Sequence, residues 1–288
     1  MRGQTYLVEM KETLATSNFN LQRNIAEWGP ETYVNWAKNP VYKAVVFIHG
    51  FNGSSMETFG GFNYEFRYRS EYDGRDVFFY GYDSLYQQIS NSALSFLEFL
   101  KAIHNDLSAV IKSSGIKLKR ENEYSEIVII CHSLGAVVAR VALNSGYDYK
   151  AGAFLNKCKL ILFAPAHKGA RKSIGNLIAF PGYLRPLGPL IHHFVLTLDQ
   201  LLEPKTIIEP MEQKCKNIIA HDKIKTFTIA KKVIWAAPER AVINDFFGDD
   251  PQPRQYKKVK VNHVMVCKPT RRFTDPFDEV AEVLNDAI

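Results

Sequence analysis

Ser133 lies where two different sequence patterns meet. Residues 126–131 are an apolar, β-branched run that predicts a buried strand, and residues 134–146 have apolar side chains at helical spacing. The pentapeptide CHSLG (131–135) has a small residue two positions before the serine and another two positions after it. A serine on a sharp strand-to-helix turn presents its hydroxyl as a nucleophile, and small neighbours avoid clashes with adjacent backbone. The simpler alternative is a serine that caps the helix.

A second segment could stabilise the charge that a nucleophilic serine creates. Residues 45–54, VVFIHGFNGS, are a strand-like run that reaches His49 and Gly50 and continues as a glycine-containing loop. A backbone N–H in such a loop can stabilise the oxyanion that forms when a carbonyl is attacked. We expect Phe51 and Leu134 to supply the two N–H donors of an oxyanion hole, and His49 to order the loop. The alternative is a glycine-rich turn that binds nothing.

Of the eight histidines, His263 has the position that a general base requires. It follows the strand-like run 258–262 and precedes the last helical segment, so it should lie at the carboxyl edge of a sheet, over Ser133. His132 is adjacent to the serine, and we expect its side chain to point away from the reacting group. The other histidines lie in a long helical segment or in and near an inserted region: His104, His167, His192, His193 and His221.

The acid that orients the histidine should follow a late strand and precede His263. Four carboxylates satisfy this order, Glu239, Asp245, Asp249 and Asp250. Glu239 comes directly after VIWAAP, where a predicted strand ends, whereas the last two lie in GDDPQP, a polar run typical of an exposed turn. We therefore predict Glu239 as the catalytic acid, with Asp245 in reserve. The alternative role for Glu239 is an exposed ion pair with a neighbouring basic residue.

Composition limits the classes of protein that fit this chain. Its 288 residues are 46% hydrophobic and 23% charged, with a net charge of +6, as in a globular soluble protein. The short basic clusters lack interleaved aromatic residues, so we expect no nucleic-acid partner. The four cysteines have neither metal-binding nor disulfide spacing, and we expect no metal and no organic cofactor. The N-terminal segment lacks the apolar core of a signal peptide, which favours a cytoplasmic location.

The order of the segments predicts an α/β fold with a mostly parallel central sheet and helices on both faces, because short apolar runs alternate with helical patterns. We expect one domain over residues 1–288. The expected strands are 42–50, 76–83, 126–131, 159–166, 227–237 and 258–262. The expected helices are 92–115, 134–146 and 275–288.

An inserted segment of approximately residues 170–222 is too long for an ordinary connection between a strand and a helix. Its most apolar stretch, 174–202, is interrupted by charges and prolines and should not span a bilayer. One interpretation is a buried packing element. The other is a cap or lid over a cleft for an ester or lipid substrate with an apolar acyl chain, with peripheral membrane contact through the cap as an extension.

Taken together, the segments FIHGFNGS, YGYDS, IVIICHSLGAVVAR, LILFAPAHKGA and NHVMVCKP resemble the serine esterase and lipase-like branch of the α/β-hydrolase superfamily, which includes GPI-inositol-deacylase-like proteins. The resemblance covers residues 42–170 and 225–288. It implies an α/β-hydrolase fold, the chain order nucleophile, acid, histidine, and hydrolysis of carboxylic esters through an acyl-enzyme on Ser133. PERAV (238–242) is similar to the Asp-x-x-Val turn of this family, with glutamate in the carboxylate position.

Two departures from the family pattern are evident, Cys131 in place of glycine and Glu239 in place of aspartate. Because a fold does not determine a reaction, other activities on the same fold remain alternatives. These are a thioesterase, an acyltransferase or a peptidase. A further alternative is a catalytically silent module that binds a partner.

Overall fold

The computed structural model describes residues 18–20, 22–120, 123–148, 152–169, 205–221, 230–239, 241–242 and 256–286. Within these ranges the strands form one eight-stranded sheet with the order β1-β2-β4-β3-β5-β6-β7-β8. The strands are β1 Arg23–Asn24, β2 Tyr33–Asn35, β3 Lys43–Ile48, β4 Asp76–Tyr80, β5 Glu126–His132, β6 Cys158–Phe163, β7 Lys232–Ala236 and β8 Tyr256–Val259. Strands β3 to β8 are parallel to one another, and β1 and β2 add an antiparallel edge next to β4.

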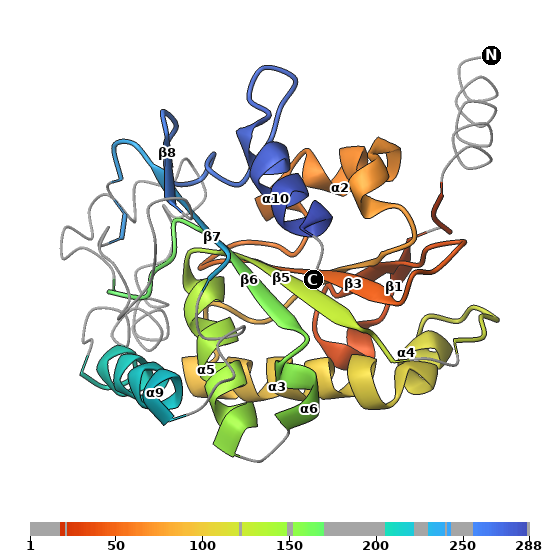
Figure 1. The fold of residues 1–288 in the computed structure, drawn as a ribbon, viewed down its shortest axis with the longest axis horizontal. Helices are drawn as coiled ribbons and strands as arrows, with labels where there is room; N and C mark the ends of the chain where they lie inside the picture. The colour runs from red at the N-terminus through yellow and green to blue at the C-terminus, as the bar shows by residue number, and fades with distance from the viewer. Residues whose placement is uncertain are drawn as a thin grey trace.

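Helices cover both faces of the sheet, as expected for parallel strands that are buried on both sides. Figure 1 shows α3, α5, α6 and α9 on one face and α2 and α10 on the other. The helices are α2 Phe62–Glu65, α3 Ile89–Asn105, α4 Leu107–Ser113, α5 Leu134–Asp148, α6 Gly152–Leu155, α9 Ile208–His221 and α10 Asp275–Asn285. Every residue of β4 and of β5 is buried, which explains their nearly continuous apolar sequences. No helix in the described ranges combines the length and apolar character needed to cross a bilayer.

The segment 92–115, predicted as one helix, forms two. Helix α3 ends at Asn105 and α4 begins at Leu107. Asp106 between them has φ −141° and ψ 57°, and its side chain accepts a hydrogen bond from the N–H of Ala109 at 3.1 Å. The aspartate therefore caps α4. Its side chain accepts from a backbone N–H that would bond to a backbone carbonyl in a continuous helix.

Gly146, which the sequence suggests as the end of a helix, instead lies inside α5, which continues to Asp148. A Cβ atom at this position would lie 3.0 Å from Cδ1 of Leu97 in α3 and 3.3 Å from Cδ2 of Leu155. The glycine thus permits close packing of α5 on its neighbours rather than terminating the helix.

Helix α9 is the described part of the predicted inserted segment. It packs against α5, where Nδ2 of Asn144 donates to the carbonyl oxygen of Met211 at 3.3 Å. Met211, Cys215 and Ile218 are buried on this face of α9. The rest of the predicted cap, including the apolar stretch 174–202, lies outside the described residues.

Candidate active site

Ser133 occupies the single position between β5, which ends at His132, and α5, which begins at Leu134. Its φ angle is +52°, in the left-handed region that a non-glycine residue adopts only where its surroundings hold it there. The backbone N–H of Ser133 donates to the carbonyl of Phe163 at 3.0 Å, and its own carbonyl accepts from the N–H groups of Ala136 and Ala166 at 3.1 Å each. The bonds with Phe163 and Ala166 hold the serine against the end of β6, and the bond from Ala136 belongs to the first turn of α5.

The small residues on either side of Ser133 have clear structural reasons. A Cβ atom on Gly135 would lie 2.4 Å from the carbonyl oxygen of His49 and 2.5 Å from that of Ile48, so only glycine fits. Cys131 is fully buried in β5, between Ile48 of β3 and Leu162 of β6. Burial raises the pKa of the Cys131 thiol, so it stays neutral and acts as a small apolar side chain.

The loop after β3 brings its backbone next to the serine. A Cβ atom on Gly50 would lie 2.8 Å from Cβ of Ser133, so the glycine permits this close approach. His49 is buried, and its Nδ1 donates to the carbonyl of Gly50 at 2.8 Å, while its Nε2 accepts from the N–H of Tyr82 at 3.3 Å. Burial lowers the pKa of His49 to about 4, so the imidazole is neutral at pH 7. This geometry fits a residue that orders the loop.

The N–H groups of Phe51 and Leu134 are available to a ligand. No residue in the described part of the chain accepts a hydrogen bond from either of them. The next N–H in the loop, that of Asn52, is by contrast bonded to Oγ of Ser84 at 3.0 Å. Leu134 directly follows Ser133 at the start of α5, and Phe51 follows Gly50 in the loop that approaches the serine. Their role as an oxyanion hole stays a prediction.

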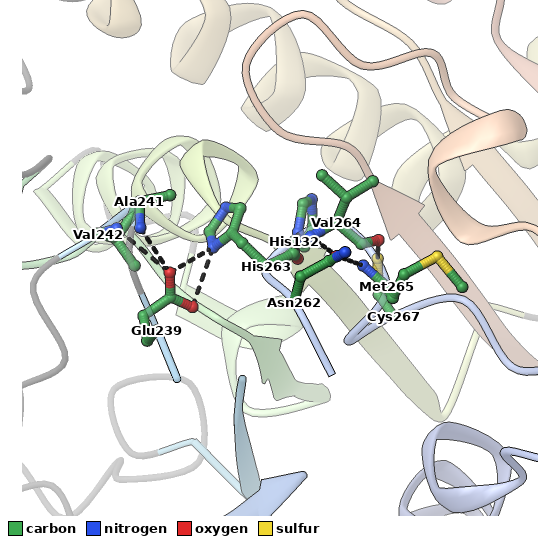
Figure 2. A network of polar contacts seen from close by, with 9 residues as sticks. All are labelled: His132, Glu239, Ala241, Val242, Asn262, His263, Val264, Met265 and Cys267. Atoms are coloured by element: carbon green, nitrogen blue, oxygen red, sulfur yellow. Dashed lines mark hydrogen bonds and ion pairs between the residues drawn. The ribbon is translucent and has the colours of Figure 1, made fainter. Parts of the chain in front are cut away.

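Glu239 and His263 meet at the carboxyl ends of the last two strands. Nδ1 of His263 lies 3.0 Å from both carboxylate oxygens of Glu239, whose side chain is completely buried. Figure 2 shows the same carboxylate bonded to the backbone N–H groups of Ala241 and Val242, at 2.9 and 3.4 Å. Although burial raises the pKa of Glu239, the bonds from His263 and from this backbone bring it below its ordinary value. The carboxylate is therefore ionised at neutral pH.

His132 contacts the backbone of His263, which its position in the sequence does not indicate. Its Nε2 lies 3.0 Å from the backbone carbonyl oxygen of His263, and the two imidazole rings are 5.0 Å apart at 49° (Figure 2). The contact joins residues that are 131 positions apart, so no local pattern in the sequence could indicate it. His132 also lies among the residues that line the cavity at Ser133.

This cavity has a volume of about 170 Å³ and contains both Ser133 and His263 in its lining. Its walls come from the loop after β3, the ends of β5 and β6, the turn after β7 and the loop that follows β8: residues 50–54, 57–58, 132–133, 166, 241–242, 263–264 and 268. The structure thus brings three predicted site residues, Ser133, His263 and Phe51, to one cavity. His132, whose side chain we expect from the sequence to point away from the reacting group, is also part of the lining. Glu239 lies behind His263.

Among the described candidates, His104 and His167 are not part of the lining of this cavity. His104 packs against Phe154 in the helical layer, and His167 packs against Trp235. Asp245, Asp249 and Asp250 lie outside the described residues, as do His192 and His193. The geometry therefore supports Glu239 as the partner of His263. It does not test the three aspartates that were the alternative candidates for the acid.

Comparison with known proteins places this architecture among solved structures. No protein-family model and no curated protein matches the sequence. An α/β-hydrolase superfamily protein from Enterococcus faecalis matches with a TM-score of 0.57 and 11% identity, covering 94% of this chain and 100% of that one. An inhibited esterase B from Lactobacillus rhamnosis matches with a TM-score of 0.52 and 11% identity, covering 99% and 93%. A peroxisomal α/β-hydrolase from Saccharomyces cerevisiae matches with 0.51 and 12% identity, covering 89% and 82%.

The sheet order, the position of Ser133 and these matches define the class of structure. The chain has the α/β-hydrolase fold, as its sequence predicts. At identities of 11 to 12% the likeness concerns the fold. The specific resemblance to GPI-inositol-deacylase-like proteins stays a prediction.

Proposed function

We propose that the protein is a serine hydrolase that cleaves carboxylic esters through an acyl-enzyme on Ser133. The observation that carries the proposal is the convergence on one cavity of a serine at positive φ and a histidine held by a buried carboxylate. A hydroxyl is a poor nucleophile at neutral pH, so a paired histidine is the group that would make this serine reactive.

In this mechanism His263 takes the hydroxyl proton as Ser133 attacks the ester carbonyl. Glu239 accepts a hydrogen bond from Nδ1–H of His263, which leaves Nε2 as the basic nitrogen, and its charge stabilises the imidazolium that forms. The carbonyl oxygen of the substrate becomes negatively charged and accepts hydrogen bonds from the N–H groups of Phe51 and Leu134, each typically worth about 3 kcal/mol.

Collapse of this intermediate releases the alcohol, which takes the proton from His263. Water then enters, gives a proton to the same imidazole and attacks the acyl-enzyme. A second collapse breaks the bond between Oγ and the acyl carbon, and His263 returns its proton to Oγ, which frees the acid and restores Ser133. All of these steps use side chains and backbone groups that the chain itself supplies.

The test is a hydrolysis panel that runs from short p-nitrophenyl esters to phospholipids, combined with labelling by a fluorophosphonate probe. We expect the wild-type protein to hydrolyse esters and to react with the probe, and Ser133→Ala to lose both while its circular dichroism spectrum stays unchanged. Retained labelling in Ser133→Ala would contradict the proposal. If the wild-type protein cleaves thioesters or peptides but no oxygen ester, the proposal that Ser133 is the nucleophile stands. The proposed reaction, ester hydrolysis, is then wrong.

The substrate that we propose has an apolar acyl chain of medium or greater length. Support comes from the apolar stretch 174–202, for which a cap over the cleft is one of the two interpretations of the sequence. A strict preference for acetate esters, with activity lost as the chain lengthens, would contradict this part of the proposal. Sedimentation with liposomes tests the further proposal of membrane contact through the cap. A protein that does not sediment with the liposomes would contradict this contact.

A further inference from the structure

His132 is a buried histidine that the proposed mechanism does not use. Only 7% of its surface is exposed, although it directly precedes Ser133 and lies in the lining of the catalytic cavity. A buried polar side chain normally has a defined hydrogen-bonding role, because an unpaired one is costly. The role of His132 follows from what each of its ring nitrogens contacts.

The ring nitrogens of His132 have different surroundings. Nε2 lies 3.0 Å from the carbonyl oxygen of His263, which can only accept, so Nε2 carries the hydrogen. Nδ1 is buried and has no hydrogen-bond partner among the described residues, and a proton there would be a buried donor without an acceptor. Burial, followed by the charges of His263 and Lys268, lowers the pKa of His132 to about 3. The side chain is thus a neutral donor aimed at the backbone of His263.

The loop that carries His263 is held at separate points. Oδ1 of Asn262 accepts from the N–H groups of Val264 and Met265 at 3.1 and 2.9 Å, which shapes the turn locally. Glu239 holds the imidazole of His263. His132 supplies a link from the main chain of His263 directly to the strand end that carries the serine (Figure 2).

We propose that His132 is a positioning residue that sets the distance and orientation of His263 relative to Ser133, an inference that rests on the proposed function. The bond from Nε2 to the carbonyl of His263 connects the two reacting residues through one side chain, whereas Glu239 controls only the tautomer and tilt of the ring. A displacement of a catalytic group by about 1 Å can reduce the rate by about a hundredfold. Loss of this link should therefore lower kcat and change KM little.

The experiment compares His132→Phe, which keeps a planar ring without a donor, with His132→Gln, whose amide NH2 can donate to the same carbonyl. Both variants are assayed on a p-nitrophenyl ester, with active sites counted by a fluorophosphonate. We expect kcat to fall by about ten- to a hundredfold in His132→Phe, KM to stay within about threefold, and His132→Gln to recover much of the loss. The rate of labelling should follow kcat, since both depend on the reactivity of Ser133.

His104→Phe provides a matched control, because His104 is also a buried histidine whose Nδ1 has no partner among the described residues, but it lies in α3 outside the cavity. It should change the melting temperature and leave kcat per active site unchanged. If His132→Phe behaves in the same way, with full kcat per labelled site, the inference is wrong. If His132→Phe does not fold, His132→Asn, whose shorter amide cannot reach the carbonyl, replaces it with the same expected loss.

The experiment distinguishes a wrong proposed function from a wrong positioning role. A wild-type protein without ester hydrolysis and without labelling would contradict the hydrolase itself. A fully active wild type with a fully active His132→Phe would contradict only the positioning role.

Discussion

Replacing Glu239 with glutamine changes one carboxylate oxygen to an NH2 group and keeps the size of the side chain. The remaining amide oxygen can still accept from the N–H of Ala241, which bonds the carboxylate at 2.9 Å. The same oxygen lies 3.0 Å from Nδ1 of His263 and can still accept from it, but the new NH2 group replaces the second oxygen at that distance, so a donor now faces the Nδ1–H donor and disfavours this tautomer and ring orientation. The imidazolium that forms during catalysis also loses its counter-charge.

The size of this loss can be worked from the contact. Nδ1 of His263 lies 3.0 Å from each oxygen of Glu239. Two unit charges at about this distance interact by about 5 kcal/mol when the effective dielectric constant is about 20. Since about 1.4 kcal/mol corresponds to a factor of ten, complete loss would slow the reaction by about 10⁴. The glutamine keeps a dipole and water can enter, so we expect kcat to fall by about 10³ to 10⁴ with little change in KM.

The assay is steady-state hydrolysis of a p-nitrophenyl ester by Glu239→Gln and Asp245→Asn side by side. A thermal melt and the circular dichroism spectrum establish that each variant is folded. Asp245→Asn serves as the comparison, because Asp245 is the reserve candidate for the acid and follows the same predicted strand. It lies outside the described part of the chain. A Glu239→Gln variant near wild-type activity, beside an Asp245→Asn variant that lost several orders of magnitude, would refute the reasoning.

Further changes separate the requirements of the fold from those of the reaction. Gly135→Ala places a methyl group within 2.5 Å of two backbone carbonyl oxygens, so we expect a loss of at least about 2 kcal/mol in the free energy of unfolding, measured in urea, and loss of esterase activity; unchanged stability would contradict the close contact. Glu126 lies at the other end of β5, where Arg75 and Lys159 bond its carboxylate at 2.7 and 2.5 Å. Although burial raises the pKa of Glu126, these hydrogen bonds bring it below 4.5, so its stabilisation is present above pH 4.5 and is lost as the pH falls through the lowered pKa. Glu126→Gln should therefore lower the free energy of unfolding by about 2 kcal/mol at neutral pH and leave kcat unchanged. The difference in free energy of unfolding between variant and wild type should shrink in acid. A difference that grew in acid would contradict the lowered pKa of Glu126.

The parts of the fold that sequence reasoning predicts are those in which burial dominates. Strands β3, β4 and β5 are almost entirely buried, so their apolar runs mark them clearly. The break at Asp106 is less visible, because apolar spacing continues across it and the cap depends on one local backbone conformation. The antiparallel strands β1 and β2 have only two and three residues, too few to establish a period of two.

The candidate site is predictable to the extent that each of its residues follows the end of a strand. Ser133, the loop from His49 and the pair formed by Glu239 and His263 all share this position, and parallel strands bring their carboxyl ends to one edge. The contact from His132 to the backbone of His263 depends on the relative position of two loops. No single segment encodes that position, so only the folded chain shows it.

The free N–H groups of Phe51 and Leu134 have a consequence for hydrogen exchange. The amide hydrogens of Ser133 and Ala166 are bonded to carbonyl groups and can exchange with solvent only when those bonds open. Those of Phe51 and Leu134 have no such acceptor in the described part of the chain, so no bond to a described residue has to break before they exchange. If the two groups form the proposed oxyanion hole, a tetrahedral adduct on Ser133 gives both of them an acceptor at once. The change in their protection would then report the charge that the site holds, independently of any turnover.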